Sequence, residues 1–355
     1  MKKIFKFIGG LILLIALLFG VFLLWISQQD YMPSAVESVP VVEHRQLSIQ
    51  TDSLSFISWN IGYAGLDVGM DFFYDGGKKT RTDELTTRNN LNRIIEFLQY
   101  EPVDFILLQE VDFKAKRSYR INQADLISLG LSEYNHVQVV NYDVPFVPVP
   151  LTNPMGQVYA GMMTLTAFSI EGAMRYAYPQ IVGWPDRLFL LDRCFIETRH
   201  RLPNGADLVI LNTHNSAFVA DQQRMQLELN VIKTRMLEEY EAGNYVLAGG
   251  DWNMNPPDFT PSADFGGHHY LPLPVVIPDN MLPATWQIAF DTQAPSNRHL
   301  DEAYAKGSTG STTIDFFIVS PNIELLEIKV IDLNFENSDH NPVQMKIRLK
   351  NMFTG

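Results

Sequence analysis

The chain has little cysteine and a deficit of basic residues. Cys194 is the single cysteine among 355 residues, which excludes an intramolecular disulfide framework. It lies in the apolar run LFLLDRCFIE, so we expect a buried thiol that fills space. Lysine and arginine number 27 against 40 acidic residues, a formal net charge of −13. Because phosphate neutralisation supplies most of the affinity for DNA or RNA, this deficit argues against nucleic acid as the main partner without excluding a basic cleft.

Charge is also missing from a stretch near the N-terminus, where a hydrophobic run from Phe7 to Ile26 follows Lys2, Lys3 and Lys6. About twenty such residues in a helix cross a bilayer core. The lysines favour a cytoplasmic N-terminus, which places the rest of the chain outside the cytoplasm. A cleaved signal peptide is the alternative, but its apolar region is shorter, about 7–15 residues, and Trp25 to Gln29 offer no small residues for a cut. We therefore expect a retained membrane anchor over residues 1–26 and a tether over residues 27–45.

Polar side chains follow several predicted core strands. Tyr245 to Ala248 reads as a buried strand that runs through two glycines into Asp251 and Asn253. Two residues apart in extended backbone, these side chains point to one side. A carboxylate and an amide there suit a hard metal ion or a phosphate oxygen beside one. The alternative is an Asx turn, because Asp and Asn favour turns in any case.

The same pattern recurs at other strand ends. LSFISW ends at Asn60, DFILLQ is followed by Glu110, and DLVILN leads to His214. Each has a plain structural alternative, a turn cap, a solvated carboxylate or a satisfied core histidine. In the apolar strand TIDFFIVS, Asp315 needs a partner because an unpaired buried carboxylate costs several kcal/mol, about 3–5 for a broken pair. The histidine of the segment SDHNP, His340, is a natural partner, since a carboxylate fixes the tautomer of the ring.

Two further segments attract attention. KAKRSYRINQ is the most basic stretch after the anchor. It is either a solvated helix start or a phosphate clamp made by Arg117 and Arg120, with Tyr119.

The proline-rich segment Asn141 to Met155 predicts an irregular loop, because proline prevents regular strand pairing. Helical periodicity is present over residues 83–100 and 219–240. The loop-rich residues 256–312 contain three histidines without other ligand types at useful spacing, so we expect them on the surface: His268, His269 and His299.

Taken in order, the segments SWNIG, LLQEVD, LNTH, GGDWN, TIDFFIVS and SDHNPV resemble the endonuclease/exonuclease/phosphatase superfamily, whose members include DNase I-like nucleases, neutral sphingomyelinases and inositol polyphosphate 5-phosphatases. They span residues 55–343. The resemblance implies an α/β fold, a four-layered sandwich of two packed mixed sheets flanked by helices, preceded here by one transmembrane helix. Residues 46–355 would form the catalytic domain.

The resemblance also implies a role for each matched residue. Glu110 would bind the divalent metal, with Asn60 beside it and Asp339 assisting. Asp251 would orient or deprotonate the attacking water, and Asn253 would hold a phosphate oxygen. The histidines would stabilise the phosphate, His340 with its ring fixed by Asp315, and His214 as the second histidine of the family. These oxygen ligands suit Mg²⁺, or Mn²⁺ as a substitute, rather than zinc.

Two departures from the family pattern affect the substrate. The usual Gly-Asn and basic "LS-arginine-tyrosine-proline" pattern is replaced by AGMMTLTAFSI, and GDFN or GDLN becomes GDWN, with Trp252 between the two polar residues. Both departures lie where subfamilies differ.

We therefore expect a monomeric, Mg²⁺-dependent phosphoric ester hydrolase outside the cytoplasm, acting on a lipid head group or a small phosphoester. The anchor, the acidic charge and the aromatic loops favour this hypothesis. A surface nuclease is the alternative, supported by the arginine-rich stretch. A non-catalytic binding module is a third hypothesis, which the intact polar set argues against.

Overall fold

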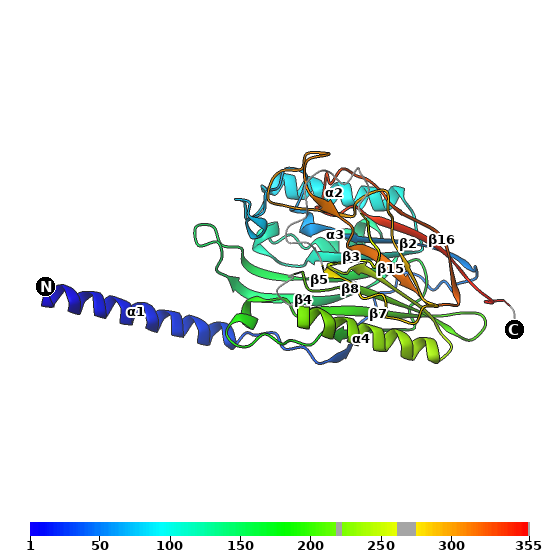
Figure 1. Cartoon of the computed structure of the whole chain (residues 1–355), viewed down its shortest axis with the longest axis horizontal. Helices are drawn as coiled ribbons and strands as arrows, with labels where there is room; N and C mark the ends of the chain where they lie inside the picture. Colours follow the sequence, from blue (N-terminus) through cyan, green and yellow to red (C-terminus); the bar gives the residue numbers. More distant parts are fainter. Residues whose placement is uncertain (218–221, 261–274, 354–355) are drawn as a thin grey trace.

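Two β-sheets packed face to face organise the residues that the computed structural model describes, 1–217, 222–260 and 275–353 (Figure 1). The first sheet has seven strands, in spatial order β1 (Val36–Ser38), β6 (Gly172–Ala177), β7 (Cys194–Arg201), β8 (Asp207–His214), β9 (Tyr245–Asp251), β15 (Asp315–Val319) and β12 (Gln287–Ala289). The second has six, in the order β16 (Ile323–Val330), β17 (Val343–Leu349), β2 (Ser53–Asn60), β3 (Phe105–Asp112), β5 (Gly156–Thr166) and β4 (Asn135–Val147). Two small pairs lie outside them, β10 (Met254–Asn255) with β11 (Val275–Val276) and β13 (Asn297–Arg298) with β14 (Ser311–Thr312).

Apolar side chains alternate along the central strands because both faces of each sheet are covered. In β3, Phe105 and Leu107 enter the core between the sheets, whereas Ile106 and Leu108 face the outer helices. Leu247 of β9 meets the first pair from the opposite sheet. The continuous apolar runs of the sequence are therefore strands buried on both sides.

Helices cover the outer faces of the sheets (Figure 1). α2 (Glu84–Tyr100) and α3 (Gln123–Gly130) pack on the six-stranded sheet, and α4 (Gln222–Glu241) packs on the seven-stranded sheet. α2 begins where the Asp83 carboxylate accepts a hydrogen bond from the Thr86 N–H, an N-cap. The predicted four-layered α/β sandwich is confirmed.

Strand register brings the polar strand ends to one edge of the sandwich. β2 and β3 are parallel, with Asn60 opposite Gln109. β8 and β9 are parallel as well, with His214 opposite Asp251. β15 runs antiparallel to β9 and starts at Asp315, which is also opposite Asp251. Three candidate site residues of the seven-stranded sheet thus lie side by side on adjacent strands.

The proline-rich segment Asn141 to Met155 is more regular than its sequence predicts. β4 continues to Val147 and pairs with β5, so the prediction of an irregular loop is wrong for residues 141–147. Pro145 falls where the register shifts between Val144 and Val147, and β4 is the edge strand of its sheet. At an edge bulge a missing N–H removes no ladder hydrogen bond. Cys194 is fully buried, as predicted.

The N-terminal helix α1 (Lys2–Ser27) projects from the body (Figure 1). Among the described residues it is the one helix that is long and apolar enough to cross a membrane. A signal sequence has the same properties, so a retained anchor stays a prediction. Only the last turns of α1 touch the body, where Leu23 and Ile26 are buried. β1 lies inside the segment that we assign to the tether and pairs with β6.

The glycine before Asp251 predicts a large effect on stability. Gly250 has φ +144°, and an added Cβ would lie 2.0 Å from the Thr213 carbonyl oxygen. We expect Gly250→Ala to lower the free energy of unfolding by about 2 kcal/mol or more, through strain and displacement of β9 from β8. Chemical denaturation of the full chain measures this change in the free energy of unfolding. Gly172→Ala, where the methyl group would meet nothing within 4 Å, is the matched control; equal losses in the two variants would contradict this reading.

Candidate active site

Four side chains from both sheets meet at the shared edge. Asn60 donates through Nδ2 to Asp251 Oδ2 (2.9 Å) and to Glu110 Oε1 (3.3 Å). His214 places Nε2 3.4 Å from Asp251 Oδ2 and 3.8 Å from Glu110 Oε1. Asp251 belongs to the seven-stranded sheet, whereas Asn60 and Glu110 belong to the six-stranded one. The site therefore exists only where the two sheets meet.

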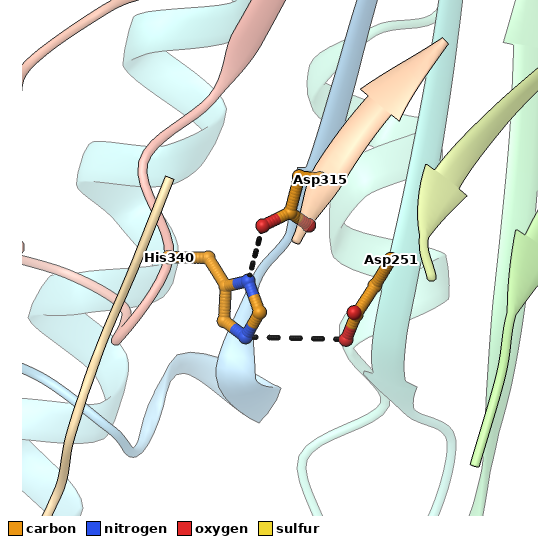
Figure 2. A group of neighbouring side chains, drawn as sticks. All are labelled: Asp251, Asp315 and His340. Atoms are coloured by element: carbon orange, nitrogen blue, oxygen red, sulfur yellow. Dashed lines mark hydrogen bonds and ion pairs between the residues drawn. The ribbon is translucent and has the colours of Figure 1, made fainter. Parts of the chain in front are cut away.

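A second group surrounds His340 (Figure 2). Its Nδ1 lies 2.7 Å from Asp315 Oδ2, and its Nε2 lies 4.0 Å from Asp251 Oδ2. Ser296 Oγ donates to the same oxygen of Asp315 (2.7 Å), and the Asn297 amide nitrogen lies 2.9 Å from His340 Nε2. The contact expected between Asp315 and His340 is present, and it orients Nε2 toward Asp251.

The loop that carries Asp339 and His340 is tied to β2. Trp59 Nε1 donates to the His340 carbonyl oxygen (2.8 Å), and Ser338 Oγ donates to the Asn60 carbonyl oxygen (2.8 Å). Asp339 Oδ2 lies 3.9 Å from His340 Nε2. These bonds hold a loop from the C-terminal part of the chain against a strand near its start.

Unusual backbone conformations direct two of the polar side chains. Glu110 has φ +54° and lies in a β-bulge of β3, between Leu108 and Val111. A bulge turns a side chain out of the regular alternation, and here it directs the Glu110 carboxylate toward Asp251. Asn253 has φ +52°. Non-glycine residues in this region are strained and concentrate at functional sites.

The tip Asp251–Asn253 forms the Asx turn that its sequence allows, and its role as a metal or phosphate site stays a prediction. The Asn253 N–H donates to Asp251 Oδ1 (2.9 Å), which is an Asx turn, and Asn253 Nδ2 donates to Asp251 Oδ2 (3.2 Å) and to the Asn215 carbonyl oxygen (2.8 Å). Trp252 points the other way, into the core, where it stacks on Phe316 with ring centroids 5.2 Å apart. The departure GDWN thus places its large residue in the core and away from the polar cluster.

Burial and neighbouring carboxylates raise the pKa of two acids of the cluster, Asp251 and Asp339. Burial and the neighbouring Asp315 raise the pKa of Asp251 to about 7, against the opposing effect of His340 and Asn60. Burial and Glu110 raise the pKa of Asp339 to about 7, although His340 and Arg298 oppose this. Crowded buried carboxylates favour either protonation or a cation between them.

The two histidines differ in charge. Burial lowers the pKa of His340, but Asp315, Asp339 and Asp251 outweigh it and raise the pKa to about 10. His340 is therefore a cation at neutral pH. Burial lowers the pKa of His214 well below its usual value, and Arg193 and His340 add to the effect, so His214 is neutral.

The donor set fits a hard divalent cation. Asp251, Asp315 and His340 offer ligand atoms within 4.8 Å of one another. However, Asp315 and His340 already bind each other, so Glu110 and Asp339, with Asp251 beside them, are the better oxygen donors for Mg²⁺. The Asn60 amide oxygen accepts from the Gly62 N–H (3.0 Å), so its amide would have to turn to ligate. Metal binding by Asn60 stays a prediction.

A cavity of about 280 Å³ opens over the cluster and is lined by Glu110, His214, Asp251, Asn253, Asp339 and His340. Of the predicted phosphate clamp, Arg117 lines the cavity, pairs with Asp112 (2.9 Å) and lies 3.8 Å above the Tyr63 ring centre. Tyr119 and Arg120 are not brought to the cavity. The Tyr119 hydroxyl donates to the Thr82 carbonyl oxygen, and Arg120 is exposed.

Sequence reasoning missed three residues of the site and misplaced one. Arg193 and Asn297 line the cavity, and Ser296 supports Asp315. The charged pair Asp192 and Arg193 in an otherwise apolar run is the available signal for Arg193, whereas Ser296 and Asn297 lie in a segment without periodicity. The prediction of His299 as a surface residue is wrong, because it lines the cavity with a side chain that is 12% exposed. His268 and His269 lie outside the described residues.

Two packed mixed sheets with outer helices, and an acid–histidine cluster at their strand ends, define a DNase I-like α/β sandwich. The profile of the Endonuclease/Exonuclease/phosphatase family matches residues 57–340, and the chain belongs to this family. Members of the family are phosphodiesterases and nucleases. The expected superfamily is therefore confirmed.

Solved structures share the fold at low sequence identity. An endonuclease/exonuclease/phosphatase from Beutenbergia cavernae DSM 12333 is 16% identical, with a TM-score of 0.55 over 84% of this chain and 72% of that chain. TDP2 from D. rerio, complexed with a single-strand DNA product, is 13% identical, with a TM-score of 0.54 over 83% and 99%. The catalytic domain of human Nocturnin with a bound sulfate anion is 14% identical, with a TM-score of 0.53 over 88% and 98%. No match was found among curated protein sequences.

The raised pKa values predict that metal binding depends on pH. With a pKa of about 7, Asp251 and Asp339 are largely protonated at pH 6 and ionised at pH 8. A cation must displace both protons at the lower pH, and each contributes a factor of about ten, so we expect the Mg²⁺ dissociation constant to be about a hundredfold higher at pH 6 than at pH 8.

Calorimetric titration of the full chain in detergent measures this constant. Asp339→Asn should weaken binding and flatten its pH dependence, because one titrating ligand is removed. Equal Mg²⁺ affinity of the unaltered protein at both pH values would contradict the assignment of these acids to the metal.

Proposed function

We propose that the protein is a Mg²⁺-dependent phosphoesterase that hydrolyses a phosphodiester or phosphomonoester outside the cytoplasm. The convergence of Glu110, Asp251 and His340 from distant segments into one cavity carries this proposal. An ordinary structural role would not gather so many buried acids around a charged histidine, because such burial costs stability. Lipid head groups and small phosphoesters are the favoured substrates.

Charge and geometry support the following chemical roles. The Asp251 carboxylate, with its pKa near 7, accepts the proton of the attacking water. The water oxygen bonds to phosphorus, the bond to the leaving oxygen breaks, and that oxygen takes a proton from solvent. His340, a cation held by Asp315, stabilises the charge that develops on the phosphoryl oxygens. Asn253 and the neutral His214 donate hydrogen bonds to the same oxygens.

Glu110 and Asp339 would hold the divalent ion, with Asp251 beside it. When bound, a divalent ion would supply positive charge to the phosphoryl oxygens and acidify a water molecule. Oxygen donors of this kind suit Mg²⁺, with Mn²⁺ as a substitute.

Location outside the cytoplasm rests on α1. The lysines before the apolar run favour a cytoplasmic N-terminus, and α1 is long enough to span a bilayer. We propose that α1 is retained as the anchor and that the body is a monomer at the outer surface.

A surface nuclease is the second candidate. A single-strand DNA product is bound in the structurally similar TDP2 from D. rerio, and Arg117 lines the cavity. Against it, Arg117 already pairs with Asp112, Arg120 lies elsewhere, and the net charge is −13. The observations therefore favour a smaller phosphoester over a nucleic acid.

His340→Ala tests the proposed function. We expect it to abolish hydrolysis and, because it leaves the buried Asp315 carboxylate without its histidine, to lower the free energy of unfolding by about 3–5 kcal/mol without unfolding the chain. The assay offers the full chain sphingomyelin, phosphatidylinositol phosphates, inositol phosphates, a soluble diester and plasmid DNA, each with Mg²⁺ and with chelator.

The outcomes separate the candidates. Rapid plasmid nicking without turnover of the other substrates would favour the nuclease. Absence of any turnover would favour a non-catalytic binding module. An unfolded His340→Ala variant would mean that the histidine is structural. Leu326→Gln, on the exposed surface of β16, is the control variant that is prepared and assayed in the same way.

A further inference from the structure

A buried arginine beside the catalytic cluster makes no side-chain hydrogen bond or ion pair with the described residues. Arg193 lies just before β7, is 8% exposed and lines the cavity. Its side chain forms no hydrogen bond or ion pair within the part of the chain that the structure describes, and its Nη1 is fully buried without one. A buried guanidinium without a partner is costly. An anion in the cavity would offset that cost.

The cavity wall next to Arg193 is apolar. It consists of Phe72, Tyr142, Met155, Phe189, Leu190 and Leu191, which we call the apolar wall. Leu190 and Leu191 are partly exposed, so the wall is open to solvent in part. The cavity thus has a polar half, with the catalytic cluster, and an apolar half. A small hydrophilic phosphoester would leave the apolar half in contact with water.

The apolar wall is continuous with the docking site of α1. Five of its six members, all except Leu190, belong to or pack on the hydrophobic cluster in which Leu23 and Ile26 of α1 are buried. Phe22 of α1 stacks on Phe189 with ring centroids 6.3 Å apart. Trp184 Nε1 donates to Ser27 Oγ (3.0 Å) at the end of α1. One face of this layer therefore holds the helix while the other lines the cavity.

Strand topology places the catalytic cluster at the same end of the body. β3 runs antiparallel to β5, and Asp112 at its end lies opposite Ala160 near the start of β5. The green connection between β4 and β5 extends toward the side from which α1 projects (Figure 1). Met155, in that connection, lines the cavity and packs in the α1 cluster. The cavity thus lies at the end of the body where α1 enters.

Large apolar side chains are exposed at this end as well. Leu151 in the β4–β5 connection is 88% exposed, Trp184 is 58% exposed and Ile181 is 40% exposed. Trp184 contacts the end of α1. Tryptophan is enriched at the interface between bilayer and water, and exposed apolar groups beside an anchor suit contact with lipid.

Resting on the proposed function, we propose that the substrate is a phospholipid of the bilayer that α1 enters. Its phosphate lies between Arg193 and the catalytic cluster, and the apolar part adjacent to its phosphate lies along the apolar wall. Hydrolysis of either phosphoester bond by water, with the proton passing to Asp251, releases a water-soluble product, the head-group alcohol or its phosphate. Because α1 fixes the cavity at the surface of the bilayer, the lipid needs to rise only part of the way out of it.

The ratio of two activities tests this assignment. The full chain is reconstituted in vesicles of phosphatidylcholine and phosphatidylglycerol with Mg²⁺, and release of water-soluble product is compared with hydrolysis of bis(p-nitrophenyl) phosphate. Leu190→Gln should lower the ratio of kcat/KM for lipid to that for the soluble diester by about tenfold, the effect of losing the burial of one leucine. Leu326→Gln, on a 41% exposed leucine of β16 outside the cavity, should leave the ratio unchanged.

Arg193 provides an independent readout. Arg193→Gln should raise KM for both substrates without lowering the melting temperature, because it removes a buried charge that has no partner. Arg193→Lys should recover part of the affinity. A lower melting temperature with unchanged KM would mean that Arg193 is structural and would overturn its role.

Failure of the inference is distinct from failure of the proposed function. Diester hydrolysis without lipid hydrolysis, or a ratio that Leu190→Gln leaves unchanged, would overturn the lipid assignment and keep the phosphoesterase. Faster cleavage of an oligonucleotide than of lipid would overturn the lipid assignment and favour the nuclease function. Loss of both activities in the unaltered protein would refute the proposed function itself.

Discussion

A hydrogen bond between the two sheets, from Asn60 Nδ2 to Asp251 Oδ2 (2.9 Å), marks the constraint on which the site depends. Below it, Gln109 Nε2 donates to Asn212 Oδ1 (2.7 Å), and Asn212 Nδ2 donates to the Met163 carbonyl oxygen (2.8 Å). Side chains buried this deeply stabilise the fold only when they find partners. A small shift of one sheet over the other would leave these amides without partners, so the same bonds that join the sheets also set the distances in the site.

Opposite charges line one cavity. Glu110, Asp251 and Asp339 crowd three acids there, and Arg193 adds a buried cation. Each arrangement is unfavourable in the protein alone, because burial penalises charges that lack partners. A divalent cation would offset the acids and a phosphate would offset the arginine. The free energy that these buried charges cost the free protein is then regained when a divalent cation and a phosphate bind.

The segment from Asp186 to Arg193 contacts α1 at one end and lines the cavity at the other. Its first residues, Asp186–Phe189, form a short 3-10 helix that packs against the end of α1. The next residues line the cavity, and Arg193 follows before β7. Because so few residues separate these contacts, the position of α1 and the shape of the cavity are mechanically linked. The body therefore has a defined orientation relative to α1.

Local patterns in the sequence determined the layers of the fold and most of the catalytic cluster. Continuous apolar runs such as Phe105 to Leu108 predict strands covered on both faces, and the polar residues that follow them, Glu110 and Asp251 among them, predict a site at the strand ends. These inferences hold because periodicity and strand ends are properties of neighbouring residues. Only the tertiary structure decided that Ser296 and Asn297 support the pair Asp315 and His340, that Pro145 lies in an edge bulge, and that Arg193 makes no side-chain hydrogen bond or ion pair with the described residues. Such facts depend on which distant segments meet, and packing of the two sheets, rather than any local propensity, decides that.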